Sequence, residues 1–400
     1  MDSGQHNEAI DVPRGRVNQS ACFRHIIKWN GGIHVPRGRE RHMFPGGNTS
    51  KGFFSFYKNI LRQEDARRIF ILKGGPGTGK STYMKKIAGE MQERGHDVEY
   101  MHCSSDNNSI DGVVIPGIGV ALLDGTAPHI CDPLNPGAVD EIINLGGFWK
   151  EEGLVKSRQK ILEIRGRIGI VFARAYRHLK AAGHLYEDSA AIYGLAVNEA
   201  EINRLAEKFK NELFYGVPLS GKTGKQRCLF AGAITPDGLK NYLDSLLTAK
   251  DVYVLEGFPG AGTERVLERI KAAALERGVD VEAYYCAFNP EKLEHLILPG
   301  LDAAFTTVNS YHNTDACAFR RVDFGNMLDK SIIASYRHEL EYDLQEFDRL
   351  LKGAVDIIHG AKALHDELES CYIPNMDFDA LRANREETMK RILSYAAIPL

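Results

Sequence analysis

The stretch from Ile69 to Arg94 constrains the fold of this chain more than any other. An apolar run, Ile69 to Leu72, enters the glycine-rich turn Gly74-Gly75-Pro76-Gly77-Thr78-Gly79, and Lys80-Ser81-Thr82 opens a helical pattern. A strand, a turn of the form Gly-x-x-x-x-Gly-Lys-Ser and a helix, in that order, make the P-loop pattern. The competing interpretation is a glycine turn that binds nothing, and the full strand–turn–helix context argues against it.

The chemistry of this pattern is phosphate binding. Glycines let the backbone wrap closely, so that successive N–H groups point at phosphate oxygens, and the helix N-terminus adds its positive dipole end. In such a loop Lys80 would reach the β- and γ-phosphates and the Ser81 hydroxyl would bind Mg²⁺. The residues predicted to bind the nucleotide are Gly74, Gly75, Pro76, Gly77, Thr78, Gly79, Lys80, Ser81 and Thr82.

A second acidic position completes the predicted metal site. Val120 to Leu123 are apolar and are followed by Asp124, as in a Walker B strand whose carboxylate holds Mg²⁺ directly or through water. We therefore predict Lys80 and Asp124 as catalytic residues, and Ser81 and Asp124 as metal ligands. His129, in the loop that follows, is equally suited to contacting phosphate or to holding the loop by a backbone hydrogen bond.

Asp106 and Asp111 follow the neighbouring predicted strand, residues 97–103. They are candidates for binding an acceptor or for orienting water. Both are also ordinary turn residues, and we favour the turn interpretation.

Length, charge and cysteine usage exclude several classes. Four hundred residues predict two or three domains, and a net charge of −3 gives no electrostatic reason to expect nucleic-acid binding. No apolar run approaches the roughly 20 residues of a membrane span, and the N-terminus lacks a signal pattern. The seven cysteines are odd in number and lack a Cys-x-x-Cys pair, which favours reduced thiols in the cytoplasm over disulfides or structural zinc.

Residues 1–40 differ from the rest of the chain. They hold Val-Pro-Arg-Gly-Arg twice, at 12–16 and 35–39, with few apolar positions between. We predict that this segment is a basic, disordered leader, or that the start codon has been placed too far upstream. A basic tail that contacts a partner is the less favoured interpretation.

Helical patterns follow in two places. Residues 52–61 predict a helix with Phe53, Phe56, Tyr57 and Ile60 on one face. From about 151 to 212, apolar residues spaced by three and four predict a long helical hairpin, with a reversal at Gly183 and an N-cap at Asn198. We expect such a hairpin to project from the sheet unless something packs on it. The apolar seam of its first helix consists of Ile161, Ile164, Ile168, Val171 and Ala175.

The second half of the chain repeats the first. An offset of 183 residues lays Gly257 on Gly74 and Cys286 on Cys103. It also pairs His129 with His312, Asp132 with Asp315 and Asp140 with Asp323, while His365 and Asp377 fall near the places of His184 and Asn198. We predict an α/β fold with two tandem P-loop domains, 41–225 and 226–400, each a mostly parallel sheet with flanking helices followed by a helical hairpin, about 151–212 and 328–395.

The two halves differ at the predicted site. Lys80 becomes Thr263, Ser81 becomes Glu264 and Asp124 becomes Thr307. The glycine turn survives, so we expect its geometry to survive. We predict that the second half is a pseudo-site that serves structure or regulation or completes the first site in trans, rather than a weak, metal-free nucleotide site.

A resemblance supports this organisation. The stretches 44–61, 74–82 and 111–140, in particular Asp124-Gly-Thr-Ala-Pro-His129, resemble a bacterial family of tandem P-loop ATPases known mainly as hypothetical nucleotide-binding proteins. The resemblance covers about residues 42–400 and implies two P-loop domains and ATP binding. It implies no substrate, and the eroded second loop departs from it.

Three functions are compatible with these residues. The first is a cytoplasmic, Mg²⁺-dependent ATPase; the second is a small-molecule kinase that uses the same loop. The third is a nucleotide-gated binding protein whose hairpins engage a protein partner. ATP is favoured over GTP because the guanine-specifying Asn-Lys-x-Asp string does not occur in the sequence. The residue that would orient an attacking water cannot be identified from the sequence.

Overall fold

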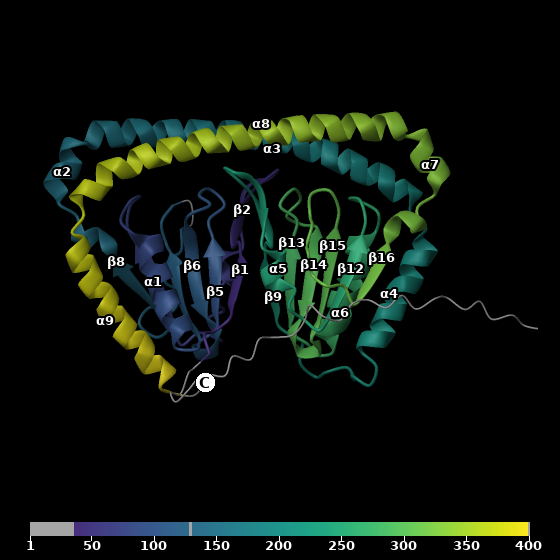
Figure 1. The fold of residues 1–400 in the computed structure, drawn as a ribbon, viewed down its shortest axis with the longest axis horizontal. Helices are drawn as coiled ribbons and strands as arrows, with labels where there is room; N and C mark the ends of the chain where they lie inside the picture. Colours follow the sequence, from purple (N-terminus) through teal and green to yellow (C-terminus); the bar gives the residue numbers. More distant parts are fainter. Residues whose placement is uncertain (1–35, 128–129, 399–400) are drawn as a thin grey trace, which may run out of the picture. The chain divides into compact units, whose positions relative to one another are not determined.

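Three β-sheets carry the described part of the chain, which in this computed structural model comprises residues 36–127 and 130–398 (Figure 1). Residues 1–35, most of the predicted leader, and His129 lie outside the described residues. From Pro36 onward the chain forms one compact unit.

The first six-stranded sheet holds the predicted P-loop region. Its strands are, in spatial order, β1 (Glu40–Met43), β5 (Val98–His102), β6 (Ile110–Ile115), β7 (Val120–Asp124), β4 (Arg68–Lys73) and β8 (Asp140–Asn144). The sheet is mixed, because β6 runs antiparallel to β5 and β7 while the other neighbours are parallel. Helix α1 (Lys80–Glu93) follows β4. The predicted strands at 69–72, 97–103 and 120–124 and the helix at 81–94 are confirmed.

The second six-stranded sheet repeats this arrangement. Its strands are, in the equivalent order, β9 (Gln226–Leu229), β13 (Val281–Tyr285), β14 (Leu293–Leu298), β15 (Ala303–Val308), β12 (Asp251–Glu256) and β16 (Arg320–Asp323). Helix α6 (Thr263–Glu276) follows β12 as α1 follows β4. The chain is thus an α/β protein with an internal duplication in its topology.

A small third sheet links the halves through β11 (Gly238–Asn241), β10 (Gly232–Thr235), β2 (Gly46–Thr49) and β3 (Gly52–Ser55). The predicted helix at 52–61 is wrong: a tight turn with Gly52 at φ 89° starts β3, and a short 3-10 turn, Tyr57–Asn59, follows. The aromatic side chains that suggested a helical face pack instead against aromatic side chains of the second half. The ring centroids of Phe56 and Phe230 lie 4.9 Å apart.

Four charged side chains meet between the two large sheets, and we call them the charge square. Arg41 on β1 pairs with Glu99 on β5 (2.8 Å) and with Glu282 on β13. Arg227 on β9 pairs with Glu99 (2.6 Å) and lies 3.7 Å from Glu282. Because Arg227 and Glu282 occupy in the second half the places of Arg41 and Glu99, each arginine joins its own half to the other.

The helical segments do not form the predicted hairpins. Helix α2 (Glu151–Lys156) leads into α3 (Arg158–Ala196), whose 39 residues span about 58 Å, and α4 (Glu199–Leu213) follows. The predicted reversal at Gly183 is wrong, since α3 continues through it. Gly183 instead permits a close approach, because a Cβ atom there would lie 2.5 Å from Ser50. Asn198 caps α4 as predicted.

The second half has the same succession, α7 (Lys330–Ser335), α8 (Arg337–Tyr372) and α9 (Phe378–Ala396). Helices α3 and α8 pack antiparallel along each other, with Lys160 near Glu367 at one end and Ser189 bonded to Asp343 toward the other (Figure 1). The predicted apolar seam of α3 therefore packs against α8. No helix in the described ranges is both long and apolar enough to cross a bilayer.

Each long helix crosses to the opposite half, so the helix that follows it in sequence packs there. Ile202 and Phe209 of α4 join the apolar core around α6, whereas Leu381 and Ile392 of α9 join the core around α1. Two isolated backbone bridges mark the crossings, Val197 with Leu328 and Trp149 with Met376. The helix that covers the first half therefore comes from the end of the chain.

These bridges fix the register of the repeat beyond residue 140. Trp149 corresponds to Leu328 and Val197 to Met376, an offset of 179 instead of 183. The pairing of Asp140 with Asp323 is consequently wrong: Asn144 is the equivalent residue, and both cap a following 3-10 turn. The pairing of His184 with His365 is also wrong, because His365 corresponds to Tyr186. The loop between β7 and β8 accounts for the four-residue difference.

The charge square predicts a large effect of Arg227→Ala. Glu99 is 3% exposed, so removing Arg227 leaves a buried carboxylate with half of its partners. We expect a loss of about 3–5 kcal/mol in the free energy of unfolding, measured by urea denaturation. Arg349→Ala, which breaks an exposed pair with Glu346, should leave the midpoint unchanged. Equal midpoints for both variants would refute a structural role of the square.

The contact between His42, His102 and Tyr242, where the two halves meet, predicts that the stability of the protein depends on pH. Burial, His42 and Lys85 lower the pKa of His102 from 6.5 to about 3, and its ring bonds to His42 and Tyr242. The folded state then binds fewer protons than the unfolded state between these values, so this stability is present above pH 6.5 and falls as the pH drops toward 3. His102→Gln should lose less stability than wild type between pH 7 and 4.5 in urea titrations; an unchanged slope would contradict this.

Candidate functional site

The glycine-rich loop between β4 and α1 has the backbone conformation that its glycines predict. Gly77 and Gly79 have φ of 67° and 82°, a region that side-chain-bearing residues avoid, and Gly79 is the N-cap of α1. Thr78 closes the turn by donating its hydroxyl to the carbonyl of Gly75 at 2.9 Å. The first-turn amides of α1 therefore begin at the loop.

Lys80 and Asp124 lie together at this loop. The Lys80 ammonium donates to the carbonyls of Gly74 and Gly75, both at 2.9 Å, and lies 3.6 Å from Asp124 Oδ2. Asp124 Oδ1 accepts from the backbone N–H of Thr126 at 2.9 Å, which fixes the carboxylate at the end of β7. The structure thus brings together the two predicted catalytic side chains.

The predicted metal ligands are Ser81 and Asp124. Ser81 starts the first turn of α1, and its hydroxyl oxygen accepts from the N–H of Ile110 at 3.1 Å, which ties the helix to β6. Both side chains offer oxygen atoms, the ligands that Mg²⁺ prefers, and two protein ligands suffice for an ion that keeps several waters. The donor set therefore fits magnesium.

Asp111 lies deeper than its turn interpretation implied. It belongs to β6, is 3% exposed, and faces Tyr57 and Cys103. Burial, then the Asp111 carboxylate, raises the pKa of both Tyr57 and Cys103, so the phenol and the thiol stay protonated at neutral pH. Asp106 does form a turn, with Oδ1 accepting from Asn108 N–H at 2.9 Å.

The end of α8 covers the loop. The N–H of Gly77 donates to Glu369 Oε1 at 3.1 Å. A Cβ atom on Gly77 would lie 2.9 Å from Ile373 and 3.1 Å from the carbonyl oxygen of Glu369, and one on Gly75 would lie 3.0 Å from Tyr372. Helix α8 also reaches the turn after β5, because Lys362 lies 3.4 Å from Asp106. The site is therefore built from both halves of the chain.

The equivalent place in the second half keeps the conformation of the glycine-rich loop but lacks the charged residues of the first. Gly260 and Gly262 have φ of 82° and 99°, which match Gly77 and Gly79, so the expected survival of the turn is confirmed. Thr263 and Thr307 are fully buried, and their Oγ1 atoms have no hydrogen-bond partner among the described residues. The residues that replace Lys80 and Asp124 thus carry no charge.

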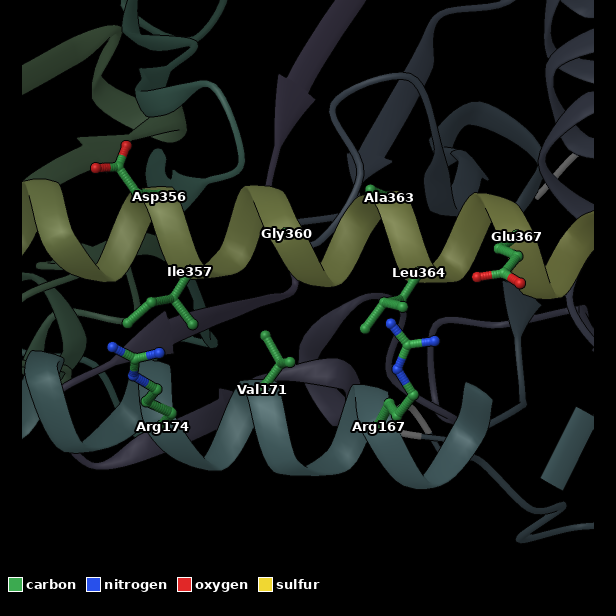
Figure 2. A pocket seen from close by; sticks show the side chains of 9 residues that line it. All are labelled: Arg167, Val171, Arg174, Asp356, Ile357, Gly360, Ala363, Leu364 and Glu367. Carbon is green, nitrogen blue, oxygen red and sulfur yellow. The ribbon is translucent and has the colours of Figure 1, made fainter. Parts of the chain in front are cut away.

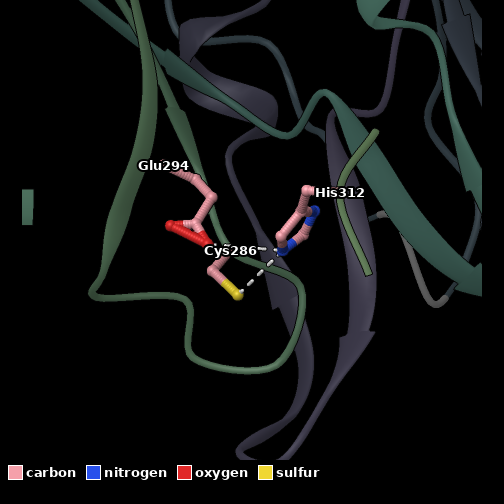
Figure 3. Close-up of side chains that lie close together, drawn as sticks. All are labelled: Cys286, Glu294 and His312. Atoms are coloured by element: carbon pink, nitrogen blue, oxygen red, sulfur yellow. Dashed lines mark hydrogen bonds and ion pairs between the residues drawn. The ribbon is translucent and has the colours of Figure 1, made fainter. Parts of the chain in front are cut away.

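The second half also holds a buried ionic cluster, of which Figure 3 shows Cys286, Glu294 and His312. Lys292 pairs with Glu294 at 3.0 Å. His312 Nε2 lies 3.4 Å from Glu294 and 3.7 Å from Cys286 Sγ. The ligand atoms of Cys286, Glu294 and His312 lie within 4.8 Å of one another. Burial raises the pKa of the Cys286 thiol to about 11 and lowers that of His312, so Lys292 supplies the positive charge that Glu294 requires.

Two arginines of α3 line a groove between the two long helices. Arg167 and Arg174 line a groove of about 580 Å³ between α3 and α8, opposite Asp356 and Glu367 (Figure 2). Gly360, at the middle of the groove, leaves the space open.

Comparison with known proteins adds little. A family model described as Nephrocystin 3, N-terminal, matches residues 54–113, a small part of the chain that contains β4, the glycine-rich loop and α1. No curated protein and no solved structure matches the chain significantly.

Glu369, Tyr372 and Lys362 are the residues at this site that sequence reasoning missed. They lie almost 300 positions from the loop in sequence, and no local pattern marks them. At the offset of 179 the counterpart of Glu369 is Ala190, but the two long helices differ at many other positions as well.

The buried cluster predicts a coupled pair of substitutions. Lys292→Met should lower the free energy of unfolding by about 3–5 kcal/mol, because it leaves the fully buried Glu294 carboxylate without its cation. Adding Glu294→Gln removes the unpaired charge and should recover part of this loss, as measured by urea denaturation. Additive losses in the double variant would contradict the ion-pair account.

Proposed function

We propose that this protein is a Mg²⁺-dependent ATP-binding protein that hydrolyses ATP at the loop formed by Gly74 to Thr82. The observation that carries the proposal is the placement of Lys80, which is held in the loop 3.6 Å from Asp124 at the N-terminus of α1. Backbone N–H groups, a lysine and a carboxylate at a strand end are the parts that phosphoryl transfer requires.

Each residue would have a distinct role. The amides of Thr78 to Ser81 would bind phosphate oxygens, and Lys80 would stabilise the charge that develops on the transferred phosphoryl group. Ser81 and Asp124 would hold Mg²⁺, which supplies neutralising charge to the phosphates. Catalysis then consists of positioning and electrostatic stabilisation.

The second half would serve as a pseudo-site. Thr263 and Thr307 replace the lysine and the aspartate by uncharged side chains, and Glu264 places a carboxylate at the start of α6, where phosphate would lie. A cytoplasmic location is supported by the six cysteines of the described residues, all of which are free thiols.

A nucleotide-gated binding protein is the second candidate. One observation favours it: the loop amide of Gly77 bonds to Glu369 on α8, a helix that spans both halves. Phosphate at the loop would act on this contact, and the exposed faces of α3 and α8 would engage a protein partner. Slow turnover with tight binding would distinguish it from the ATPase.

The proposal predicts the behaviour of two variants. Wild type should bind ATP with Mg²⁺ and hydrolyse it, whereas Lys80→Ala should lose about 10³-fold or more in steady-state rate, because a transition-state charge loses its partner. Asp124→Asn should show a similar loss together with a raised Mg²⁺ requirement. The measurements are nucleotide binding by calorimetry and phosphate release.

The matched control is Lys86→Ala, which removes an exposed lysine from the same helix. Its rate and affinity should equal those of wild type. A wild-type protein that binds no nucleotide at all would disprove the proposal, and binding without turnover would favour the gated binder.

A further inference from the structure

One face of α8 presents polar side chains to the first half. Lys362, His365 and Glu369 are spaced by three and four residues, so they lie on the same side of the helix. Lys362 lies 3.4 Å from Asp106, Glu369 accepts from Gly77 N–H, and His365 Nδ1 lies 3.9 Å from Glu369 Oε1. This face leads from the turn after β5 to the glycine-rich loop.

The second half supplies an internal comparison. At the offset of 179, α3 presents Gly183, Tyr186 and Ala190 where α8 presents Lys362, His365 and Glu369. The long helix approaches the loop closely in both halves: a Cβ on Gly260 would lie 2.0 Å from the carbonyl oxygen of Ala190, and one on Gly77 would lie 3.1 Å from that of Glu369. Hence the approach of the helix to the loop needs no glutamate side chain.

The glutamate is therefore found together with the phosphate-binding residues, and the packing of the helix on the loop does not require it. It is present over the loop that keeps Lys80, Ser81 and Asp124, and it is replaced by Ala190 over the loop that has lost all three. A carboxylate beside a phosphate-binding loop is unfavourable in itself once phosphate is bound, because the two anions repel.

We propose that Glu369, which the second half of the chain supplies to the site in the first half, is a catalytic residue. It binds and orients the water that attacks the terminal phosphate of ATP. The inference rests on the proposed hydrolysis at Lys80. It answers the question that the first half leaves open, since Lys80, Ser81 and Asp124 handle phosphate and metal but none of them is assigned to water.

The step is a hydrolysis. The water oxygen forms the new bond to the γ-phosphorus, and the bond from that phosphorus to the β–γ bridging oxygen breaks, with its electron pair leaving on ADP. The water proton passes to the Glu369 carboxylate and then to the phosphate product, which restores the carboxylate. A carboxylate in this role contributes about 10²- to 10⁴-fold.

The test is Glu369→Gln in the full chain. Glutamine keeps an oxygen that accepts from Gly77 N–H, so the fold and the loop contact are retained, but it does not take a proton from water. We expect kcat to fall about 100-fold or more while ATP affinity stays equal or rises, because a negative charge near the phosphates is gone. Thermal unfolding should be unchanged.

The control is Glu367→Gln, the same substitution two positions away. Glu367 pairs with Lys160 and faces the groove between α3 and α8, so kcat should stay at the wild-type value. Loss of kcat in Glu369→Gln alone supports the inference.

Three results would overturn it. An unchanged kcat in Glu369→Gln would make the contact structural, and a raised kcat with tighter ATP binding would make Glu369 a competitor of phosphate. A wild-type protein that binds ATP but does not hydrolyse it would remove the step while leaving nucleotide binding intact. Absence of nucleotide binding in wild type would instead refute the proposed function itself.

Discussion

The crossing of α3 and α8 is the constraint on which the rest of the structure depends. Helices α1 and α6 each have an apolar face that the strands of their own sheet cover only in part. The remaining cover is α9 for α1 and α4 for α6, and both are delivered by the long helix of the opposite half. Neither apolar core is complete without the other half, so the duplication is folded as one unit.

The charge square adds specificity to this exchange. Burying arginine and glutamate is costly unless each charge is paired, and here every carboxylate is shared between an arginine of its own half and one of the other. A shifted docking of the two sheets would leave four charges without partners. The apolar cluster around it, with Met43, Ile71 and Val254, makes the contact favourable, and the square selects one arrangement.

How much the sequence could predict depended on the range of the interaction. The strand before Gly74, the turn and the helix after Lys80 follow from local glycine and apolar patterns, and the placement of Asp124 beside Lys80 follows from neighbouring parallel strands. The repeat was visible as well. Gly183 was misread because a glycine serves close packing as readily as it serves a turn, and only the position of Ser50 tells them apart. Glu369 was missed because nothing local marks a side chain delivered by a helix of the other half.

The second half shows which parts of such a site are needed for shape. It keeps Gly260 and Gly262 in the left-handed conformation, and it keeps the helix that lies against the loop, although the lysine, the serine and the aspartate are gone. Its buried Glu294 is neutralised by Lys292, from the chain itself. In the first half the buried Asp111 faces uncharged Tyr57 and Cys103 instead. One half thus pairs its buried carboxylate with its own lysine, and the other keeps Lys80 and Asp124 together at the glycine-rich loop.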